Sequence, residues 1–429
     1  MRISRGGSSA WAAAVALFSL VGAVAGQDRP LSADFPEVYR VGGFDAPEWA
    51  EFAGAPVVAF DAAGRLYVQE GTAMSAVLGG SAGPVVVIDP GGSLIRTVGG
   101  AGEGPGEFDE PRGLVVWRDG RLAVADVGHN AYQLFTPDGE FERLVRMGGG
   151  AGGFSGLMNE RSRLRPDPAG PALIAQGVSS GQNAFTSAVG RMFGAEEAEE
   201  GRVDDRGLER LRLDGEDVVA ERLLQGWRPA PDDDGQESPL DLSDPTSIIG
   251  TIMGGERWFE PELLWDLLPD GGIVYSDSSS YRIRVTDPAG REIRTLTRPF
   301  APKPVTRGVR SAMRDRSLAR LPEGDGSDMR AAIREQIRNR GFMDEIPVLS
   351  ALRTTWDGAL WIQRRGEEPW DEDGPIDVMR ADGAYVGTFA AGATEVPDAF
   401  GPDGLVAFVE RDELDIPSIV VRRIPVEVR

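Results

Sequence analysis

One short pattern recurs six times along this chain of 429 residues, and it limits the folds that the chain can adopt. In each copy, a turn that contains Asp and Gly comes directly before a short apolar strand. The turns begin at Asp61, Asp119, Asp167, Asp270, Asp357 and Asp403. Gly accepts the positive φ that tight hairpin turns require, so this pattern predicts antiparallel strands. A second turn of the same kind follows in five copies, which gives each copy four short strands.

Radial repetition of four antiparallel strands predicts an all-β fold, the six-bladed β-propeller. The sixth copy stops after its third strand, residues 419–421, and no second turn follows. Residues 37–43 at the other end of the chain resemble the fourth strand of the first copy, residues 96–100, and both end in Gly-Gly. We therefore expect the propeller to span residues 35–429 and the N-terminal strand to complete the last blade. Closing the ring in this way removes exposed strand edges.

Insertions make the spacing of the copies uneven. Two polar and acidic loops, residues 176–205 and 227–256, interrupt the chain in and after the third blade. A third insertion, residues 303–345, lies between blades four and five and is predicted to be helical. In it Ser327 is a candidate N-cap, Ile333 and Ile337 follow Met329 at helical spacing, and Gly341 is a candidate C-terminal cap. It carries nine arginines, so we expect it to pack on the propeller through ion pairs or to bind an acidic partner.

The N-terminus predicts a signal peptide over residues 1–25. Arg2 and Arg5 supply the positive start, an apolar stretch follows over residues 10–24, and Ala23-Val24-Ala25 has the small residues of a cleavage site. The alternative is an uncleaved anchor, although the stretch is short for a membrane span. No later apolar segment has the length of a span, so we expect a periplasmic or secreted monomer with no membrane span after cleavage.

Composition excludes several classes of site. The chain has no cysteine, which excludes disulfides, zinc-thiolate sites and a Cys nucleophile. His129 is the only histidine, so a Ser-His-Asp triad or a His-rich metal site would need that residue. The formal net charge of −23 disfavours nucleic acid as a partner.

The second blade resembles the NHL repeat. Residues 124–139 run from an apolar pair and Asp, through a Gly/His/Asn turn and an apolar strand, to Asp-Gly. Residues 275–285 of the fourth blade are similar, and the Gly-rich segment 99–108 resembles the crossing between blades in that family. The resemblance implies a six-bladed propeller whose relatives include partner-binding domains, sensor domains and some enzymes. His129 and Asn130 stand in the reverse of the family's usual order, and Ala131 replaces its usual Arg.

Four residues are candidates for a binding site, and no catalytic or metal-ligating residue is assigned. Arg112 lies in the crossing that enters an inner strand. Asp126, like Asp277 in the fourth blade, follows a second strand, where Asp could meet a ligand on the rim or cap its own turn. His129 could be a lone general base that Asn130 orients, or the two residues could simply form a surface hairpin.

Other motifs are better explained by structure. The Gly-rich residues 99–106 precede a Pro and another strand, whereas a dinucleotide fingerprint needs a helix there, so they predict a crossing between blades. The acidic runs at residues 232–235 and 323–328 lack the ligand spacing of an EF-hand and predict solvated loops.

These observations favour an exported, non-enzymatic scaffold that binds an envelope protein or a small ligand on one face. The alternative is a calcium-dependent hydrolase similar to the gluconolactonase-type propellers, although no segment aligns with their calcium cluster. No cofactor is predicted, and calcium stays open because the alternative would require it. Any site is expected at the rim or mouth of the channel, where loops of several blades converge.

Overall fold

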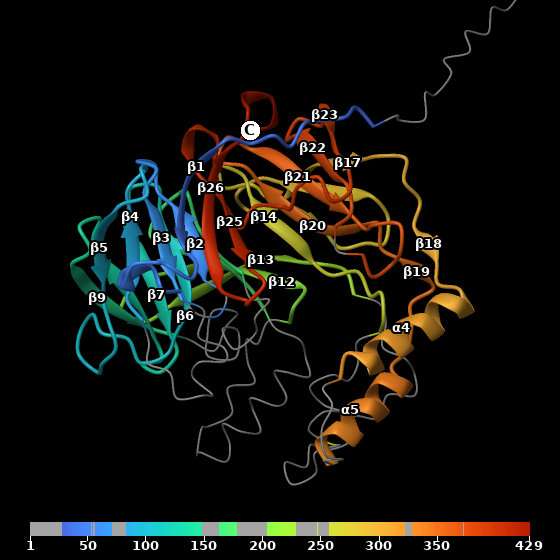
Figure 1. The fold of residues 1–429 in the computed structure, drawn as a ribbon, viewed down its shortest axis with the longest axis horizontal. Helices are drawn as coiled ribbons and strands as arrows, with labels where there is room; N and C mark the ends of the chain where they lie inside the picture. Colours follow the sequence, from blue (N-terminus) through green and yellow to red (C-terminus); the bar gives the residue numbers. More distant parts are fainter. Residues whose placement is uncertain are drawn as a thin grey trace, which may run out of the picture.

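The computed structural model describes residues 28–52, 56–70, 83–147, 163–177, 204–228, 257–321, 328–371 and 373–429, together with Gly54 and Ser247. Within these residues the chain forms six four-stranded antiparallel sheets arranged around a central axis (Figure 1). The six-bladed β-propeller predicted from the repeated turns is confirmed. The predicted signal peptide, the acidic run at 232–235, the run at 323–328 apart from Asp328, and most of the loops at 176–205 and 227–256 lie outside the described residues.

Each of the first three blades follows the order of the chain from the inner strand outward. Blade one contains β2 (Val57–Phe60), β3 (Leu66–Gln69), β4 (Val85–Ile88) and β5 (Leu94–Val98). Blade two contains β6 (Pro111–Val116), β7 (Leu122–Asp126), β8 (Ala131–Phe135) and β9 (Phe141–Arg146). Blade three contains β10 (Leu164–Pro166), β11 (Ala172–Gln176), β12 (Gly207–Arg212) and β13 (Val219–Gln225).

Blades four and five repeat this order, and the last blade is built from both ends of the propeller. Blade four contains β14 (Leu264–Leu267), β15 (Ile273–Ser276), β16 (Arg282–Thr286) and β17 (Glu292–Thr297). Blade five contains β20 (Leu349–Thr354), β21 (Ala359–Arg364), β22 (Ile376–Arg380) and β23 (Tyr385–Phe389). Blade six contains β24 (Ala399–Phe400), β25 (Leu405–Arg411), β26 (Pro417–Arg423) and the N-terminal β1 (Glu37–Gly42). Three short 3-10 segments also occur among the described residues: Glu48–Ala50, Pro402–Gly404 and Val426–Val428.

The recurrent Asp-Gly turns join the first and second strands of every blade. In blade one the carboxylate of Asp61 accepts hydrogen bonds from the backbone N–H groups of Ala63 (2.9 Å) and Arg65 (3.0 Å). Gly64 closes this turn with a φ of +75°, a conformation that a side chain would disfavour. In this turn the Asp therefore holds the backbone and the Gly permits its conformation, which explains why such a pair predicts a hairpin in the sequence.

The described residues of the blades form a ring of six hydrophobic clusters, one between each pair of neighbouring blades. A seventh cluster, which includes Phe259, Val305 and Ile346, lies beside the insertion. Between blades one and two, for example, Tyr67 and Val87 pack against Leu122 and Phe135. The middle strands supply most of these residues because both of their faces are covered by adjacent blades. The first strands are left to line the axis, where polar side chains can face a cavity.

β1 pairs with β26 in antiparallel register, with Val41 opposite Ile419. Tyr39 and Val41 on its inward side belong to the cluster between blades six and one. Gly92, in a turn of blade one, is the glycine on which Tyr39 packs, and a Cβ there would lie 2.9 Å from the tyrosine ring. β1 therefore contributes both to the sheet of blade six and to the contact of that blade with blade one.

The insertion between blades four and five contains two helices, whereas the sequence analysis assigned caps for only one. α4 (Arg307–Ala319) begins at Thr306, whose side chain accepts a hydrogen bond from the N–H of Val309 (3.3 Å). α5 (Asp328–Asn339) is the predicted helix, and its proposed cap, Ser327, lies outside the described residues. A two-stranded sheet, β18 (Lys303–Pro304) and β19 (Glu345–Ile346), joins the hairpin to the propeller.

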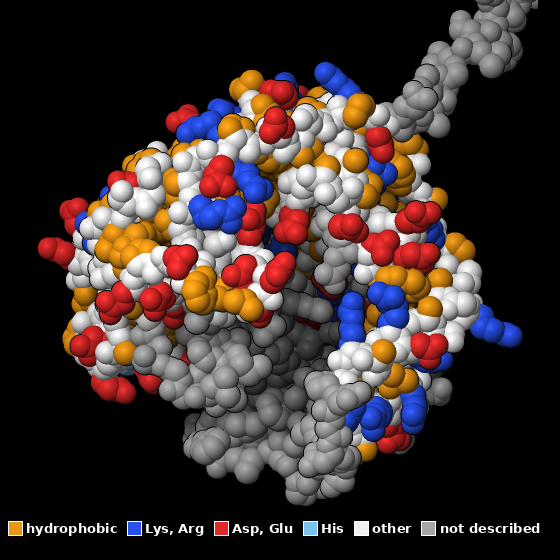
Figure 2. Space-filling view, in the orientation of Figure 1, with side chains coloured by type: hydrophobic (Ala, Val, Ile, Leu, Met, Phe, Trp, Pro, Cys, Tyr) orange, Lys and Arg blue, Asp and Glu red, His pale blue; other side chains and the backbone are white. Residues whose placement is uncertain are grey.

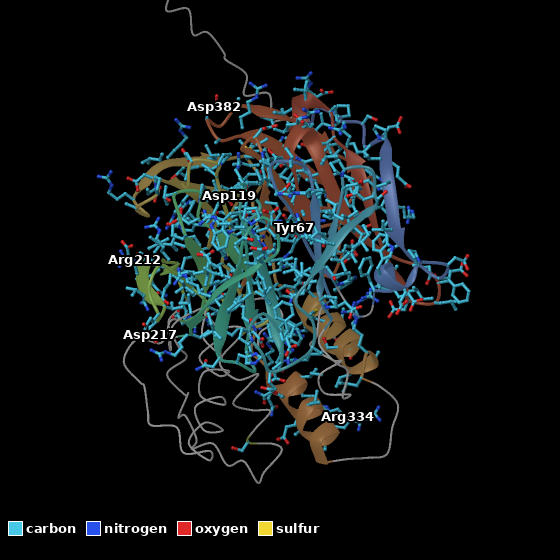
Figure 3. All side chains as sticks on the ribbon, turned by 90° about the vertical axis from the view of Figure 1, so that its left-hand side faces the viewer. Tyr67, Asp119, Arg212, Asp217, Arg334 and Asp382 are labelled. Atoms are coloured by element: carbon cyan, nitrogen blue, oxygen red, sulfur yellow. The ribbon has the colours of Figure 1, made fainter. Side chains whose placement is uncertain are left out.

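The helical hairpin projects from the face of the ring where the inner strands begin. Figure 3 shows Arg334 of α5 at the opposite end of the molecule from Asp382, which lies in an outer turn of blade five. Basic side chains gather on the hairpin, while acidic ones are spread over the visible blades (Figure 2). Neither helix in the described part of the chain is both long and apolar enough to cross a membrane.

Candidate functional site

The inner strands of all six blades enclose a central cavity of about 960 Å³. Its wall includes residues of β2, β6, β10, β14, β20 and β24, so each blade contributes to one continuous space. A volume of this size is at the upper end of the range for small-molecule sites. The cavity is therefore the concave feature in which a ligand could contact every blade.

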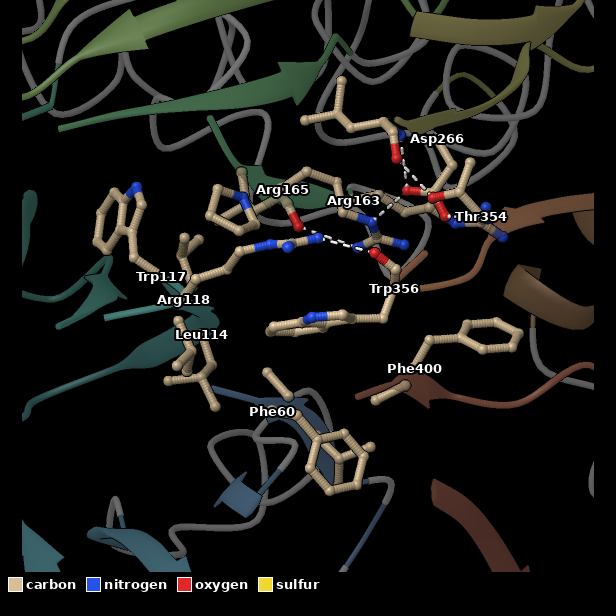
Figure 4. Close-up of a pocket in the computed structure, with 18 of the residues that line it drawn as sticks. Phe60, Leu114, Trp117, Arg118, Arg163, Arg165, Asp266, Thr354, Trp356 and Phe400 are labelled. Carbon is tan, nitrogen blue, oxygen red and sulfur yellow. Dashed lines mark hydrogen bonds and ion pairs between the residues drawn. The ribbon is translucent and has the colours of Figure 1, made fainter. Parts of the chain in front are cut away.

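Arginine side chains gather on one side of this cavity, around a single buried carboxylate. Asp266 of β14 accepts a hydrogen bond from Nε of Arg165 (2.8 Å), a neighbour on β10, and another from the backbone N–H of Thr354 (3.0 Å). The Nε of Arg353, on β20, lies 3.9 Å from the same carboxylate. Arg163 stands two residues before Arg165, and both line the cavity (Figure 4). We call Arg163, Arg165, Arg353 and Asp266 the arginine cluster.

Burial makes the charged forms of the side chains in this cluster less favourable. Burial and repulsion from Arg165 and Arg163 lower the pKa of Arg353 to about 9, despite the attraction of Asp266. The pKa of Arg163 is also lowered, by burial and then by repulsion from Arg165. Burial opposes ionisation of Asp266, but the arginines outweigh it and its pKa lies below the ordinary value. At neutral pH the cluster therefore contains three cations around one carboxylate.

A stacked pair, Arg118 and Trp356, forms another part of the cavity wall. The guanidinium of Arg118 lies 4.3 Å from the centroid of the indole ring of Trp356 and donates a hydrogen bond to the carbonyl of that residue (2.8 Å; Figure 4). The two residues follow the inner strands of blades two and five, so the contact bridges the ring. The pair offers a ligand flat apolar surface beside cationic groups.

Of the four residues predicted to bind a ligand, Arg112 is the one that lines the cavity. Its side chain is largely buried and forms an ion pair with Glu110. Nε of Arg112 is buried and makes no hydrogen bond to the described residues. The structure thus places Arg112 in the wall that also carries the arginine cluster.

Asp126, His129 and Asn130 lie together at the turn between β7 and β8, outside the cavity lining. Asp126 is fully buried and accepts hydrogen bonds from the backbone N–H groups of Asp109 (3.1 Å) and Glu110 (2.8 Å). Those two residues belong to the crossing from blade one, so Asp126 fastens the incoming chain to blade two.

Asp277 has the same use in blade four. It accepts a hydrogen bond from the N–H of Trp227 (2.8 Å), which follows the last strand of blade three. The sequence analysis weighed a ligand contact against a cap of the residue's own turn for both aspartates. In the structure both hold the segment that arrives from the preceding blade.

His129 forms a hydrogen bond with Asp126, because its Nδ1 lies 2.7 Å from Asp126 Oδ2. That hydrogen bond raises the pKa of His129, and the nearby Glu103 and Asp109 act in the same direction. The protonated pair therefore stabilises the fold fully below the unfolded-state value of 6.5, and the contribution is lost as the pH rises through the higher folded-state value.

We expect His129→Gln to be less stable than the wild type by about 1 kcal/mol at pH 5.5, since it loses a hydrogen bond to a buried carboxylate. The difference should be smaller at pH 8.5, because the contribution of the protonated pair is lost as the pH rises. Urea unfolding of both proteins at the two pH values measures this. An equal difference at both values would contradict the assignment of a protonated His129–Asp126 pair.

Sequence reasoning missed Arg163, Arg165, Asp266, Arg353 and Trp356. A signal was present, because Arg163 stands directly before β10 and Arg165 lies within it, and residues two apart along an extended chain point to the same face. That spacing also describes arginines on an exposed edge, and the residues that complete the cluster lie about 100 and 190 positions away along the chain. Only the closed ring brings them together.

No family model matches this chain, and no curated protein matches it. Among solved structures it is similar to a member of the DUF4221 family from Bacteroides vulgatus, with 11% identity and a TM-score of 0.47, over 91% of this chain and 98% of that one. An exported protein from Bacteroides fragilis has 8% identity and a TM-score of 0.47, over 93% and 98%. A gluconolactonase from Xanthomonas campestris has 14% identity and a TM-score of 0.37, over 94% and 98%. These TM-scores are too low for an argument about function. The six-bladed architecture is established by the strand pairing of this chain itself.

Proposed function

We propose that this chain is an exported, monomeric propeller of the NHL type that binds a small organic molecule in its central cavity without transforming it. The observation that carries this proposal is the cavity of about 960 Å³ to which all six inner strands contribute. A ligand held there would contact residues from every blade. A closed ring makes such a site rigid, because neighbouring blades fix the position of each inner strand.

The residues that line the cavity favour binding over catalysis. The single histidine is engaged by Asp126 outside the cavity. The hydroxyl of Thr354 donates to the backbone carbonyl of Leu267 (2.5 Å), and the hydroxyl of Thr355 accepts from the N–H of Ala359 (2.9 Å). Both hydroxyls in the described part of the wall are therefore hydrogen-bonded to the backbone. The carboxylate of Asp266 lies beside Thr354, but it accepts the backbone N–H of that residue, whereas nucleophilic catalysis by a hydroxyl needs a general base that accepts the hydroxyl proton.

A thermal-shift screen with a cavity-blocked variant tests the proposal. The library would contain organic acids, phosphate esters, neutral sugars and amines. Ala351 lines the cavity, so Ala351→Trp should fill part of it, while Ala289→Trp places the same ring on an exposed turn. We expect compounds that raise the Tm of the wild type and of Ala289→Trp but not of Ala351→Trp. Compounds that stabilise all three proteins equally would locate the binding site elsewhere and overturn the proposal.

Calcium separates this proposal from the hydrolase alternative. We expect the Tm to be the same in chelator and in millimolar calcium, because the cations of the arginine cluster repel a divalent cation from the cavity. The part of the chain that the structure describes contains no group of three or more His, Asp or Glu side chains arranged to hold a metal ion. A calcium-dependent rise in Tm would instead favour the hydrolase and call for assays with lactones and esters.

A further inference from the structure

The arginine cluster differs from another buried pair of arginines, Arg298 and Arg364, in how its charge is balanced. Arg298 and Arg364 share two carboxylates, Asp377 and Asp28. In the cavity, Arg165 and Arg353 share the one carboxylate of Asp266. Buried positive charge in excess of its partners is unfavourable for folding, and such sites are typical of functional positions.

Two further acids act on the cluster, Asp398 on Arg353 and Glu262 on Arg163. The carboxylate of Asp398 accepts a hydrogen bond from the N–H of Val409 (2.7 Å), while Arg353 donates to the backbone carbonyl of Asp398 rather than to its carboxylate. Burial also raises the pKa of Asp398. Glu262 acts on Arg163, but it is exposed to solvent and therefore screened.

Geometry adds a second observation, because one donor of the cluster has no acceptor. Arg165 is held through Nε by Asp266 and through Nη1 by the backbone carbonyl of Leu164 (3.0 Å). Its remaining nitrogen, Nη2, is buried and makes no hydrogen bond to the described residues. Asp266 thus positions the guanidinium of Arg165, a residue that lines the cavity, and leaves its Nη2 without an acceptor among the described residues. A buried donor of this kind is costly unless a ligand satisfies it.

We propose that Arg163, Arg165 and Arg353 bind the oxyanion group, carboxylate or phosphate, of a small organic acid, and that Asp266 positions Arg165 for this contact. This inference rests on the proposed function, since it names the class of molecule that the cavity takes. Guanidinium groups suit oxyanions because their planar donors make charge-assisted hydrogen bonds. The Arg118–Trp356 pair supplies a flat surface for the remainder of the molecule.

The experiment measures the Tm of the mature protein in a buffer of low anion content, with inorganic phosphate or acetate added as the probe. Sodium chloride at the same ionic strength is the control for screening. We expect phosphate or acetate to raise the Tm beyond chloride, by about 3 °C at a hundredfold excess over Kd. A rise with phosphate alone assigns a phosphate group, and a rise with acetate alone assigns a carboxylate. No rise with either probe overturns the inference.

Two variants connect this rise to the cluster. Arg353→Met should abolish the anion-dependent rise, and in low-anion buffer its Tm should equal or exceed that of the wild type, because repulsion from Arg165 is removed. Arg121→Met is the matched control, since Arg121 also lines the cavity but is paired with Asp119 at 2.7 Å. It should keep the rise. A rise that persists in Arg353→Met, or a lower Tm of that variant in low-anion buffer, would show that Arg353 serves the fold instead.

The screen in the preceding subsection separates the two proposals. Cavity-dependent stabilisation by neutral sugars or amines alone would leave the binding function standing and overturn the oxyanion site. Stabilisation by acids that Ala351→Trp retains would overturn the binding function in the cavity. Stabilisation by acids that both Ala351→Trp and Arg353→Met lose supports both proposals.

Discussion

Replacing Asp377 with Asn is expected to lower the free energy of unfolding by about 3 kcal/mol. Asp377 lies in β22 and is fully buried. Its Oδ2 lies 2.7 Å from Nη1 of Arg298 and 3.3 Å from Nε of Arg364, and both arginines are largely buried as well. Arg298 follows the last strand of blade four, so the ion pair connects blade four to blade five. Asn keeps the shape of the side chain and can still accept the hydrogen bond from Thr388 (2.6 Å), so the substitution removes mainly the charge.

Asp28→Asn is the matched control for this substitution. Asp28 contacts the same two arginines, at 3.0 Å and 2.7 Å, but its side chain is 40% exposed. Because solvent screens such pairs, we expect a loss of less than about 1 kcal/mol. Urea unfolding of both variants and the wild type measures the difference. Equal losses for the two variants, or a loss below about 1 kcal/mol for Asp377→Asn, would show that burial does not determine the strength of the ion pairs of Arg298 and Arg364.

The strands of this fold were predictable from sequence because each depends on local signals. In the first turns of blades one to four the Asp accepts hydrogen bonds from backbone N–H groups two or four residues ahead. In five of the six first turns the Gly adopts a positive φ. The insertion was located for a similar reason, since Ile333 and Ile337 of α5 repeat at helical spacing. α4 received no specific assignment, and none of its residues is fully buried.

The candidate site was not predictable in the same way, because it depends on contacts between distant segments. Arg112 was found through its position in a crossing, which is a local feature. Arg353 and Asp266 had no local sequence signal. They come close because β20 and β14 are the inner strands of neighbouring blades. The aspartates after the second strands show the same limit. Their place in the sequence was visible, but their partners in the preceding crossing appear only once the blades are packed.

The second large effect concerns β1, whose inward side chains we expect to be essential for a stable ring. Tyr39 and Val41 are buried between blades six and one, so the double variant Tyr39→Ala/Val41→Ala should lose about 4 kcal/mol. Deletion of residues 35–43 should go further and give an aggregating or less stable protein, because β26 would then expose an unpaired edge. Urea unfolding and light scattering measure the two effects.

The outward side chains of the same strand provide the control, because Val38 is 38% exposed and the side chain of Arg40 is 42% exposed. Arg40 pairs with Glu37 and Glu410 at the surface, where ion pairs contribute little. Val38→Ala/Arg40→Ala should therefore stay within about 1 kcal/mol of the wild type. Both double variants keep the backbone pairing with β26, so a large loss confined to the inward pair assigns the effect to packing between blades six and one. A soluble deletion protein with the Tm of the wild type would show instead that the other five blades hold the sixth in place without β1.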